Sequence, residues 1–359
     1  MRGRARHVAR IAHRWLGLVV GVPLALIALS GVAISYWHEI DRATFDYPAP
    51  DSRVSTRPLD DQYRIARSAC TNCGRLMEIT PTQAAAATAF YFERETPGVN
   101  TVVVANADGR LLSARNGDRD VVALLYQLHS ALFLSRIGQP VVGAIGLALV
   151  AMAIVGLSLW WPRRGHWRRS LLPRLLAGPR TRQLYELHRL VGASCSIVLV
   201  LVGLSGAAMA FPSVMHRLLG VAEVSAPSGE KKPDTLSLSG LVASATTVVP
   251  ECHFTDLLLP SPNAPMAVVT LKCPGEWSRY GNTLVWVDPS TGGARLAVDG
   301  REHGRRWLLN ILVPLHSGYA LGAVGQLVFA FVALAPAILL ATGGFLFARR
   351  RKMQQPAEA

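Results

Sequence analysis

Four histidines occupy matching positions in the two halves of the chain, and imidazole is the commonest metal-binding side chain in proteins. His13 and His188 each open an apolar stretch, and each is followed at the same distance by a Ser-Gly pair. His129 and His316 are each followed, at identical spacings, by Gly-Gln and then by a single glycine. Ionisable residues near a bilayer are costly and usually functional. The pattern predicts a metal or cofactor site built on an internal repeat.

The composition is that of a membrane protein. Half of the 359 residues are hydrophobic and only 17% are charged, against about 25% in soluble proteins. Four apolar stretches reach the length of about 20 residues that a helix needs to cross a bilayer. They cover residues 16–37, 141–161, 190–211 and 324–347. The first is too long for a signal peptide and lacks a small-residue cleavage site, so we interpret it as a retained anchor.

The net charge of +14 comes largely from arginine clusters beside these apolar stretches. The positive-inside rule explains the clusters without a nucleic-acid partner. It also predicts that both termini and the loop between the second and third spans are cytoplasmic. Each half then consists of a helix, a large outer loop and a helix, so the two repeats are parallel.

We therefore expect an α-helical membrane protein with four transmembrane helices in two parallel two-helix repeats and two outward-facing α+β modules. The expected boundaries are a cytoplasmic N-terminus (1–14), helix 1 (15–38), module 1 (39–128), an interfacial segment with helix 2 (129–161), a basic cytoplasmic loop (162–187), helix 3 (188–212), module 2 (213–307), an interfacial segment with helix 4 (308–348) and a cytoplasmic tail (349–359).

Both outer loops carry strand patterns separated by turn residues, which is typical of hairpins. We expect strands at 88–93, 101–105, 111–114, 265–272, 283–287 and 295–298, and helices at 57–69 and 236–247.

Each outer module also holds two cysteines, which suggests disulfides in an oxidising compartment. These are Cys70 and Cys73 in the first module and Cys252 and Cys273 in the second. The Cys-Thr-Asn-Cys segment could instead be a redox pair, but no thioredoxin-like pattern surrounds it. We favour a structural role, and the connectivity stays open.

In the parallel arrangement, His13 faces His188 near the cytoplasmic side and His129 faces His316 near the outer side. Two imidazoles at one depth are natural axial ligands for a b-type haem, so we predict two bis-histidine haems. Ligand pairs from within one repeat remain an alternative.

Residues beside the inner pair fit the same prediction. Arg14 and Arg189 could pair with haem propionates, and Gly17 and Gly192 could clear space for the porphyrin.

Two further histidines are weaker candidates. His38 and His216 are possible alternative outer ligands or substrate contacts, but they miss alignment in the repeat by three residues. We favour a simple interfacial role for them.

Several motifs are absent from the sequence. It contains no C-x-x-C-H haem-attachment motif, no H-E-x-x-H, no G-x-S-x-G, no Walker loop and no G-x-G-x-x-G fingerprint. If the protein moves electrons, the donor is therefore a partner or a quinol and not a bound nicotinamide. We assign no catalytic side chain.

The motifs together resemble the PepSY-associated transmembrane family of bacterial inner-membrane proteins. The resemblance rests on His-Arg-Trp-Leu-Gly at 13–17, Leu-His-Ser at 128–130, Trp-Trp-Pro-Arg-Arg at 160–164, Leu-His-Ser-Gly at 315–318 and Asp-Pro-Ser-Thr-Gly at 288–292, with the counterpart Asp-Gly at 108–109. The family includes ferric-siderophore reductases of the ferrioxamine-reductase type, which hold two haems. The resemblance implies that His13, His129, His188 and His316 are the ligand positions.

The sequence thus predicts an inner-membrane di-haem reductase. It would pass electrons from a quinol or a cytoplasmic reductase to a periplasmic ferric siderophore and release iron as Fe(II). Two alternatives remain: a non-enzymatic, membrane-anchored protein whose outer modules bind or regulate a periplasmic partner, and a transporter of iron or siderophore. The substrate rests on the resemblance alone.

Overall fold

The computed structural model describes residues 3–44, 56–82, 86–94, 99–106, 108–116, 120–162, 178–224, 227 and 236–354. These residues divide into a helical unit (1–35, 125–214 and 315–359) and a second unit that contains the β-sheet (36–124 and 215–314). The two are described separately below.

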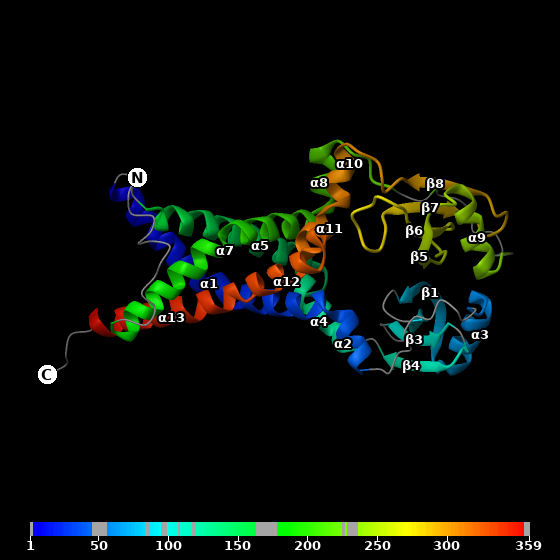
Figure 1. The fold of residues 1–359 in the computed structure, drawn as a ribbon, viewed down its shortest axis with the longest axis horizontal. Coiled ribbons are helices and arrows are strands. Elements are labelled where there is room, and N and C mark those ends of the chain that lie inside the picture. The colour runs from blue at the N-terminus through cyan, green and yellow to red at the C-terminus, as the bar shows by residue number, and fades with distance from the viewer. Residues whose placement is uncertain are drawn as a thin grey trace. The chain divides into compact units, whose positions relative to one another are not determined.

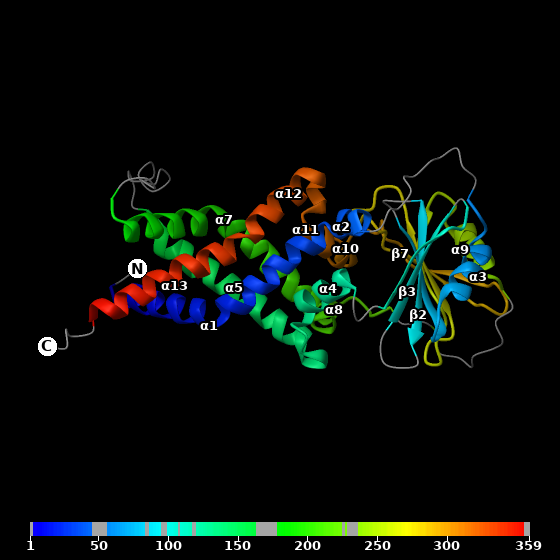
Figure 2. The ribbon, with the colours of Figure 1, turned by 90° about the horizontal axis from the view of Figure 1, so that it is seen from below.

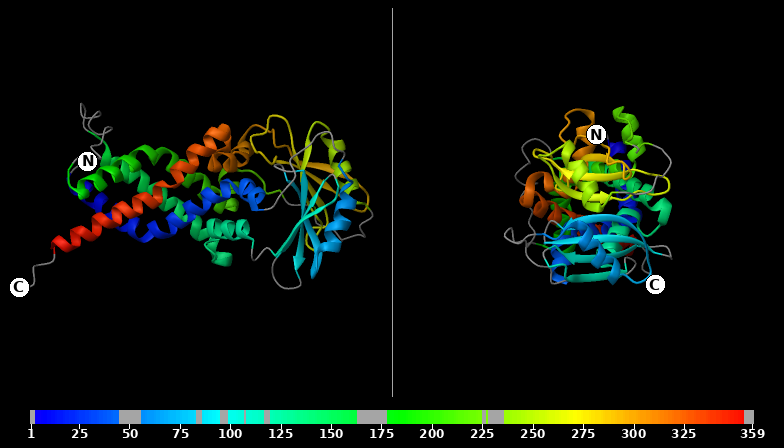
Figure 3. Two further views of the ribbon diagram at one scale, coloured as in Figure 1. Left: turned by 60° about the horizontal axis from the view of Figure 1, so that its bottom comes forward. Right: turned by 90° about the vertical axis from the view of Figure 1, so that its right-hand side faces the viewer.

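Four helices of the described residues are long and apolar enough to cross a membrane, as predicted. They are α1 (Gly3–Ser35), α5 (Ser135–Trp160), α7 (Arg180–Ala210) and a fourth span formed by α12 (Gly322–Ala333) and α13 (Ala335–Gln354). The protein is a membrane protein. Within this unit α1 packs on α13 and α5 packs on α7 (Figures 1 and 3).

The helix boundaries differ from the predicted ones in two ways. Helices α1 and α7 begin well before their apolar stretches, because arginine and glutamine are good helix formers that extend a helix outside the lipid. The fourth span is interrupted at Leu334. Pro336 follows, and a proline has no N–H to donate to the carbonyl four residues before it.

Short helices flank the spans. They are α2 (Trp37–Thr44), α4 (Val121–Ala131), α8 (Pro212–Leu219), α10 (Arg305–Asn310), α11 (Leu312–Ser317) and the 3₁₀ turn η2 (Tyr319–Leu321).

The strands of the second unit form one continuous eight-stranded antiparallel sheet in the order β4-β3-β2-β1-β5-β6-β7-β8. The strands are β1 (Cys73–Thr82), β2 (Ala87–Arg94), β3 (Val99–Ala105), β4 (Leu111–Asn116), β5 (His253–Leu258), β6 (Ala267–Lys272), β7 (Thr283–Val287) and β8 (Ala294–Val298). Six of them coincide with the predicted strands. Strands β1 and β5 were not predicted, and they are the two that join the modules.

One hydrophobic core serves both modules. Helices α3 (Leu59–Ala69) and α9 (Leu238–Val248) lie on the same side of the sheet (Figure 2). Beneath them, Phe90 and Phe92 of the first module share a cluster of buried side chains with Val269 and Leu271 of the second. The modules therefore bury their apolar faces together.

Polar contacts also cross the junction between the modules. The Asp60 carboxylate in α3 accepts hydrogen bonds from the backbone N–H groups of Leu238 (2.8 Å) and Ser239 (3.2 Å), which begin α9. A carboxylate at a helix N-terminus satisfies otherwise unpaired N–H groups. The first module thus caps a helix of the second.

On the other face of the sheet, two carboxyl groups lie at the β1–β5 junction. The Thr80 hydroxyl contacts both Asp256 (2.8 Å) and Glu78 (3.3 Å). Burial, together with the neighbouring Glu78, raises the pKa of Asp256 to about 7. A carboxyl group whose folded-state pKa is raised holds a proton that the unfolded chain has lost, so stability falls as pH rises from about 4 to about 7.

We expect Asp256→Asn to remove this pH dependence, because the amide keeps a hydrogen-bonding group beside Thr80 without a charge. At pH 8 the variant should stabilise the junction by about 1 kcal/mol. Hydrogen exchange of β1 and β5 peptides, compared between variant and parent at pH 5 and pH 8, measures this effect. Equal protection of variant and parent at both pH values would contradict the assignment.

Candidate functional site

The helical unit brings the four predicted histidines together as two pairs. His13 on α1 and His188 on α7 have ring centroids 6.4 Å apart, with their planes at 89°. His129 on α4 and His316 on α11 have ring centroids 6.0 Å apart, with their planes at 64°. Each pair contains one histidine from each half of the chain. That the two pairs are haem ligands stays a prediction.

The two pairs lie near opposite ends of the same helices. The His129 ring lies against Gly31 of α1, eighteen residues beyond His13 on that helix. At about 1.5 Å per residue this separation is about 27 Å along the helix axis. The spacing from His188 to Gly206 on α7 is the same. This separation is close to the thickness of a bilayer core, which is about 30 Å.

Each histidine ring packs against a glycine of a neighbouring helix. A Cβ atom added at Gly31 would lie 2.7 Å from Cε1 of His129, and one at Gly206 would lie 2.8 Å from Cε1 of His316. The corresponding distances are 3.0 Å from Gly156 to His13 and 3.3 Å from Gly343 to His188. These are the glycines that mark the repeat in the sequence, and their lack of a side chain gives the rings their space.

The outer pair is oriented by backbone carbonyls. Nδ1 of His129 donates to the Ile27 carbonyl (2.7 Å), and Nδ1 of His316 donates to the Val202 carbonyl (3.0 Å). The Ser205 hydroxyl also lies 3.1 Å from Nδ1 of His316. A carbonyl can only accept, so each Nδ1 carries the proton and Nε2 keeps a free lone pair. This tautomer is the one that binds a metal through Nε2.

The spacing within each pair suits a metal bound by both rings. Metal–nitrogen bonds of about 2 Å place the centroids of two opposed imidazoles about 6 Å apart. Within the described part of the chain, no three His, Cys, Asp or Glu side chains are grouped as a protein-only metal site requires. Two ligands alone leave a bare ion under-coordinated, whereas haem iron needs only axial ligands because the porphyrin supplies the rest.

Two half-buried arginines directly follow the histidines of the inner pair in the sequence. Arg189 forms an ion pair with Glu186, and the Arg14 guanidinium lies 5.8 Å from the ring centroids of Trp15 and Phe347. Nε of each arginine is buried without a hydrogen-bond partner among the described residues. A buried unsatisfied donor is costly, so these groups suit an anionic ligand.

The two predicted porphyrin-contact glycines take part in helix packing. A Cβ at Gly17 would lie 3.8 Å from the Met152 side chain, and one at Gly192 would lie 3.6 Å from Leu339. Both are ordinary packing distances. Their contact with a porphyrin stays a prediction.

The weaker histidine candidates lie elsewhere. The side chain of His38, on α2, is outside the described residues. His216 lies on α8 and donates from Nδ1 to the carbonyl of Val221 (3.2 Å), a contact within its own segment.

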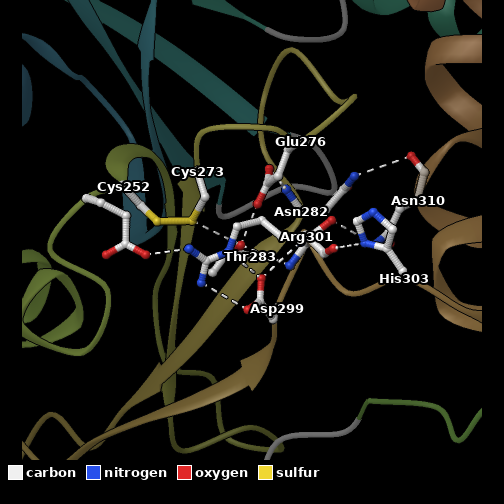
Figure 4. A network of polar contacts seen from close by, with 11 residues as sticks. Cys252, Cys273, Glu276, Asn282, Thr283, Asp299, Arg301, His303 and Asn310 are labelled. Carbon is white, nitrogen blue, oxygen red and sulfur yellow. Dashed lines mark hydrogen bonds and ion pairs between the residues drawn. A yellow bond between two sulfur atoms is a disulfide. The ribbon is translucent and has the colours of Figure 1, made fainter.

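His303 belongs to a structural network in the second module (Figure 4). It donates to the Arg301 carbonyl (2.6 Å). In the same network the buried Glu276 carboxylate accepts from Thr283 and from the backbone N–H of Asn282. These contacts stabilise the loop before β7.

The cysteines form two disulfides, Cys70–Cys73 and Cys252–Cys273. The second anchors the β5 and β6 ends beside the network of Figure 4. Cys195 is a free thiol on α7.

Sequence reasoning did not find the groups that hold the imidazoles. The Ile27 and Val202 carbonyls carry no sequence signal, because every residue has one. The glycines were visible as repeat markers, and their matched distance from the histidines was the signal for a contact.

We expect Gly206→Ala to destabilise the helical unit by about 1–3 kcal/mol, because the new methyl group would collide with His316. The matched control is Gly344→Ala on α13, where nothing lies within 4 Å of an added Cβ. That variant should be neutral, or stabilised by up to about 1 kcal/mol through helix propensity. Unfolding by SDS in mixed micelles compares the two, and equal stabilities would contradict the contact.

The family described as the PepSY-associated TM region matches residues 10–350, nearly the whole chain. No curated protein matches the sequence. The family match includes all four paired histidines and their glycines, and it confirms the resemblance seen in the motifs. The chain belongs to the PepSY-associated transmembrane family.

Proposed function

We propose that the protein is a di-haem reductase of the bacterial inner membrane that passes electrons across the bilayer to a periplasmic ferric siderophore. The observation that carries the proposal is the pairing of His13 with His188 and of His129 with His316, at centroid separations of 6.4 and 6.0 Å. A histidine pair near each end of the same spans would suit electron transfer from one membrane face to the other.

The surrounding residues would bind and orient a b-type haem in each pair. The Nδ1 hydrogen bonds hold the outer imidazoles with Nε2 directed away from the helix carbonyls. Arg14 and Arg189 would neutralise the propionates of the inner haem, which accounts for their buried unpartnered Nε groups. A bound haem supplies the one-electron chemistry, and the apolar helices around it exclude water.

The proposed orientation places both termini in the cytoplasm and the sheet in the periplasm. Its support is the positive-inside rule, applied to the arginines at 2–14 and 349–351. The four spans would form two parallel two-helix repeats, since both halves carry the same markers at matching places. His13 and His188 then form the inner site, and His129 and His316 form the outer site.

At the outer face, one electron would reduce Fe(III) in the chelate to Fe(II), which the siderophore binds much more weakly and therefore releases. The support for this substrate class is membership of the family. The electron donor would be a quinol or a cytoplasmic reductase, which must supply one electron for each iron released.

The test begins with the absorbance spectrum of the detergent-purified protein before and after dithionite, with a pyridine haemochrome count. We expect a Soret shift, resolved α and β bands and two haems per chain. A colourless protein, expressed with ample haem, would exclude the reductase and favour a binding role for the outer sheet. Reduction of a ferric siderophore, followed with an Fe(II) chelator, then tests the substrate.

We expect His129→Ala to reduce the haem count from two per chain to one, because it removes one axial ligand of the outer site only. His303→Ala, which alters a histidine of the Figure 4 network, should keep both haems. The haemochrome count measures both variants. Two haems retained in His129→Ala would refute the ligand assignment.

A further inference from the structure

The two inner histidines have different hydrogen-bond partners. Nδ1 of His188 lies 2.9 Å from the hydroxyl of Thr342 on α13. Nδ1 of His13 is buried and forms no hydrogen bond with any described residue. A backbone carbonyl faces each ring, that of Met152 at His13 and that of Leu339 at His188, but neither forms a hydrogen bond of normal geometry.

The contacts of Thr342 determine which way its hydrogen bond with His188 runs. Its hydroxyl group lies 2.7 Å from the Ile338 carbonyl and 3.2 Å from the Leu339 carbonyl, to which it donates its single proton. Toward His188 the hydroxyl must therefore accept, so Nδ1 of His188 carries the hydrogen. Nε2 is then left with its lone pair on the side of the ring away from Thr342.

The sequence repeat explains the asymmetry. Thr342 directly precedes Gly343, against which His188 packs, and Val155 directly precedes Gly156, against which His13 packs. Threonine and valine have nearly the same shape, so the two positions differ by one hydroxyl group. The first half of the chain lacks the hydroxyl acceptor that the second half has.

We propose that Thr342 is a positioning residue that fixes the His188 ring and, through its hydrogen bond, lowers the reduction potential of the haem held by His13 and His188. The inference rests on the proposed function. An acceptor on Nδ1–H makes the imidazole a stronger donor to iron. A stronger donor stabilises the ferric form relative to the ferrous form.

The experiment is a spectroelectrochemical titration of the full-length, haem-loaded protein in detergent. It is carried out in the parent and in the His129→Ala background, where the inner haem titrates alone. Thr342→Val removes the hydroxyl group and keeps the shape. Thr342→Ser keeps the hydroxyl group and loses a methyl group. Val155→Thr supplies His13 with the missing acceptor.

We expect Thr342→Val to shift the ferric–ferrous equilibrium of the inner haem about tenfold toward the ferrous form, the scale of second-shell effects at metal sites. For a one-electron couple this is a rise of 59 mV. Thr342→Ser should stay near the parent potential, Val155→Thr should lower it, and the outer haem should not change.

Unchanged potentials in both Thr342→Val and Val155→Thr would overturn the proposal. An equal shift in Thr342→Ser and Thr342→Val would assign the effect to packing of the methyl group and would also overturn it. If Thr342→Val does not fold, the reduction potential of the inner haem in Val155→Thr decides. A lower potential than in the parent supports the proposal, and an equal or higher one overturns it. Failure of the proposed function is distinct, because the parent protein would then bind no haem before any variant is compared.

Discussion

The structure of the helical unit depends on the contact between each histidine ring and a glycine of a neighbouring helix. A side chain at any of the four glycines would lie within 3.3 Å of a ring carbon. The contact therefore requires close approach of α1 to α4 and α5, and of α7 to α11 and α13. Without a hydrophobic driving force between helices in lipid, small residues and close packing determine how helices associate. The same glycines that let the helices meet also set the position of the imidazoles.

Neither half of the chain completes a histidine pair or the sheet by itself. The first half contributes His13, His129 and strands β4 to β1, and the second half contributes His188, His316 and strands β5 to β8. The β1–β5 junction covers two edges that would otherwise expose unpaired backbone groups, and such edges favour aggregation. Phe90, Phe92 and Leu271 pack in one core, so each half also needs the other to bury its apolar side chains. Folding of one half alone would leave exposed apolar surface and single imidazoles.

Much of this arrangement could be predicted from the sequence, because the repeat and the hydropathy are strong signals. The spans, six strands and the facing of His13 with His188 followed from them. Strands β1 and β5 did not, since β1 contains Gly74 and Pro81 and its pairing with β5 joins residues about 180 positions apart. Local patterns carry no information on such pairing. The interruption at Leu334 could have been inferred from Pro336, which removes a helix hydrogen bond.

The hydrogen-bond partners of the histidine Nδ1 atoms could not be predicted from the sequence, and they are of two kinds. Backbone carbonyls orient both histidines of the outer pair, so substitution of the residues that carry them changes little. At His316 the Ser205 hydroxyl adds a side-chain contact (3.1 Å). A side-chain hydroxyl orients His188, so a single substitution can alter this contact while the fold stays the same. A backbone partner fixes the geometry of a site, whereas a side-chain partner can tune it. In the proposed reductase, Thr342 is therefore a position at which closely related chains could change the affinity for electrons without any change in the four histidines.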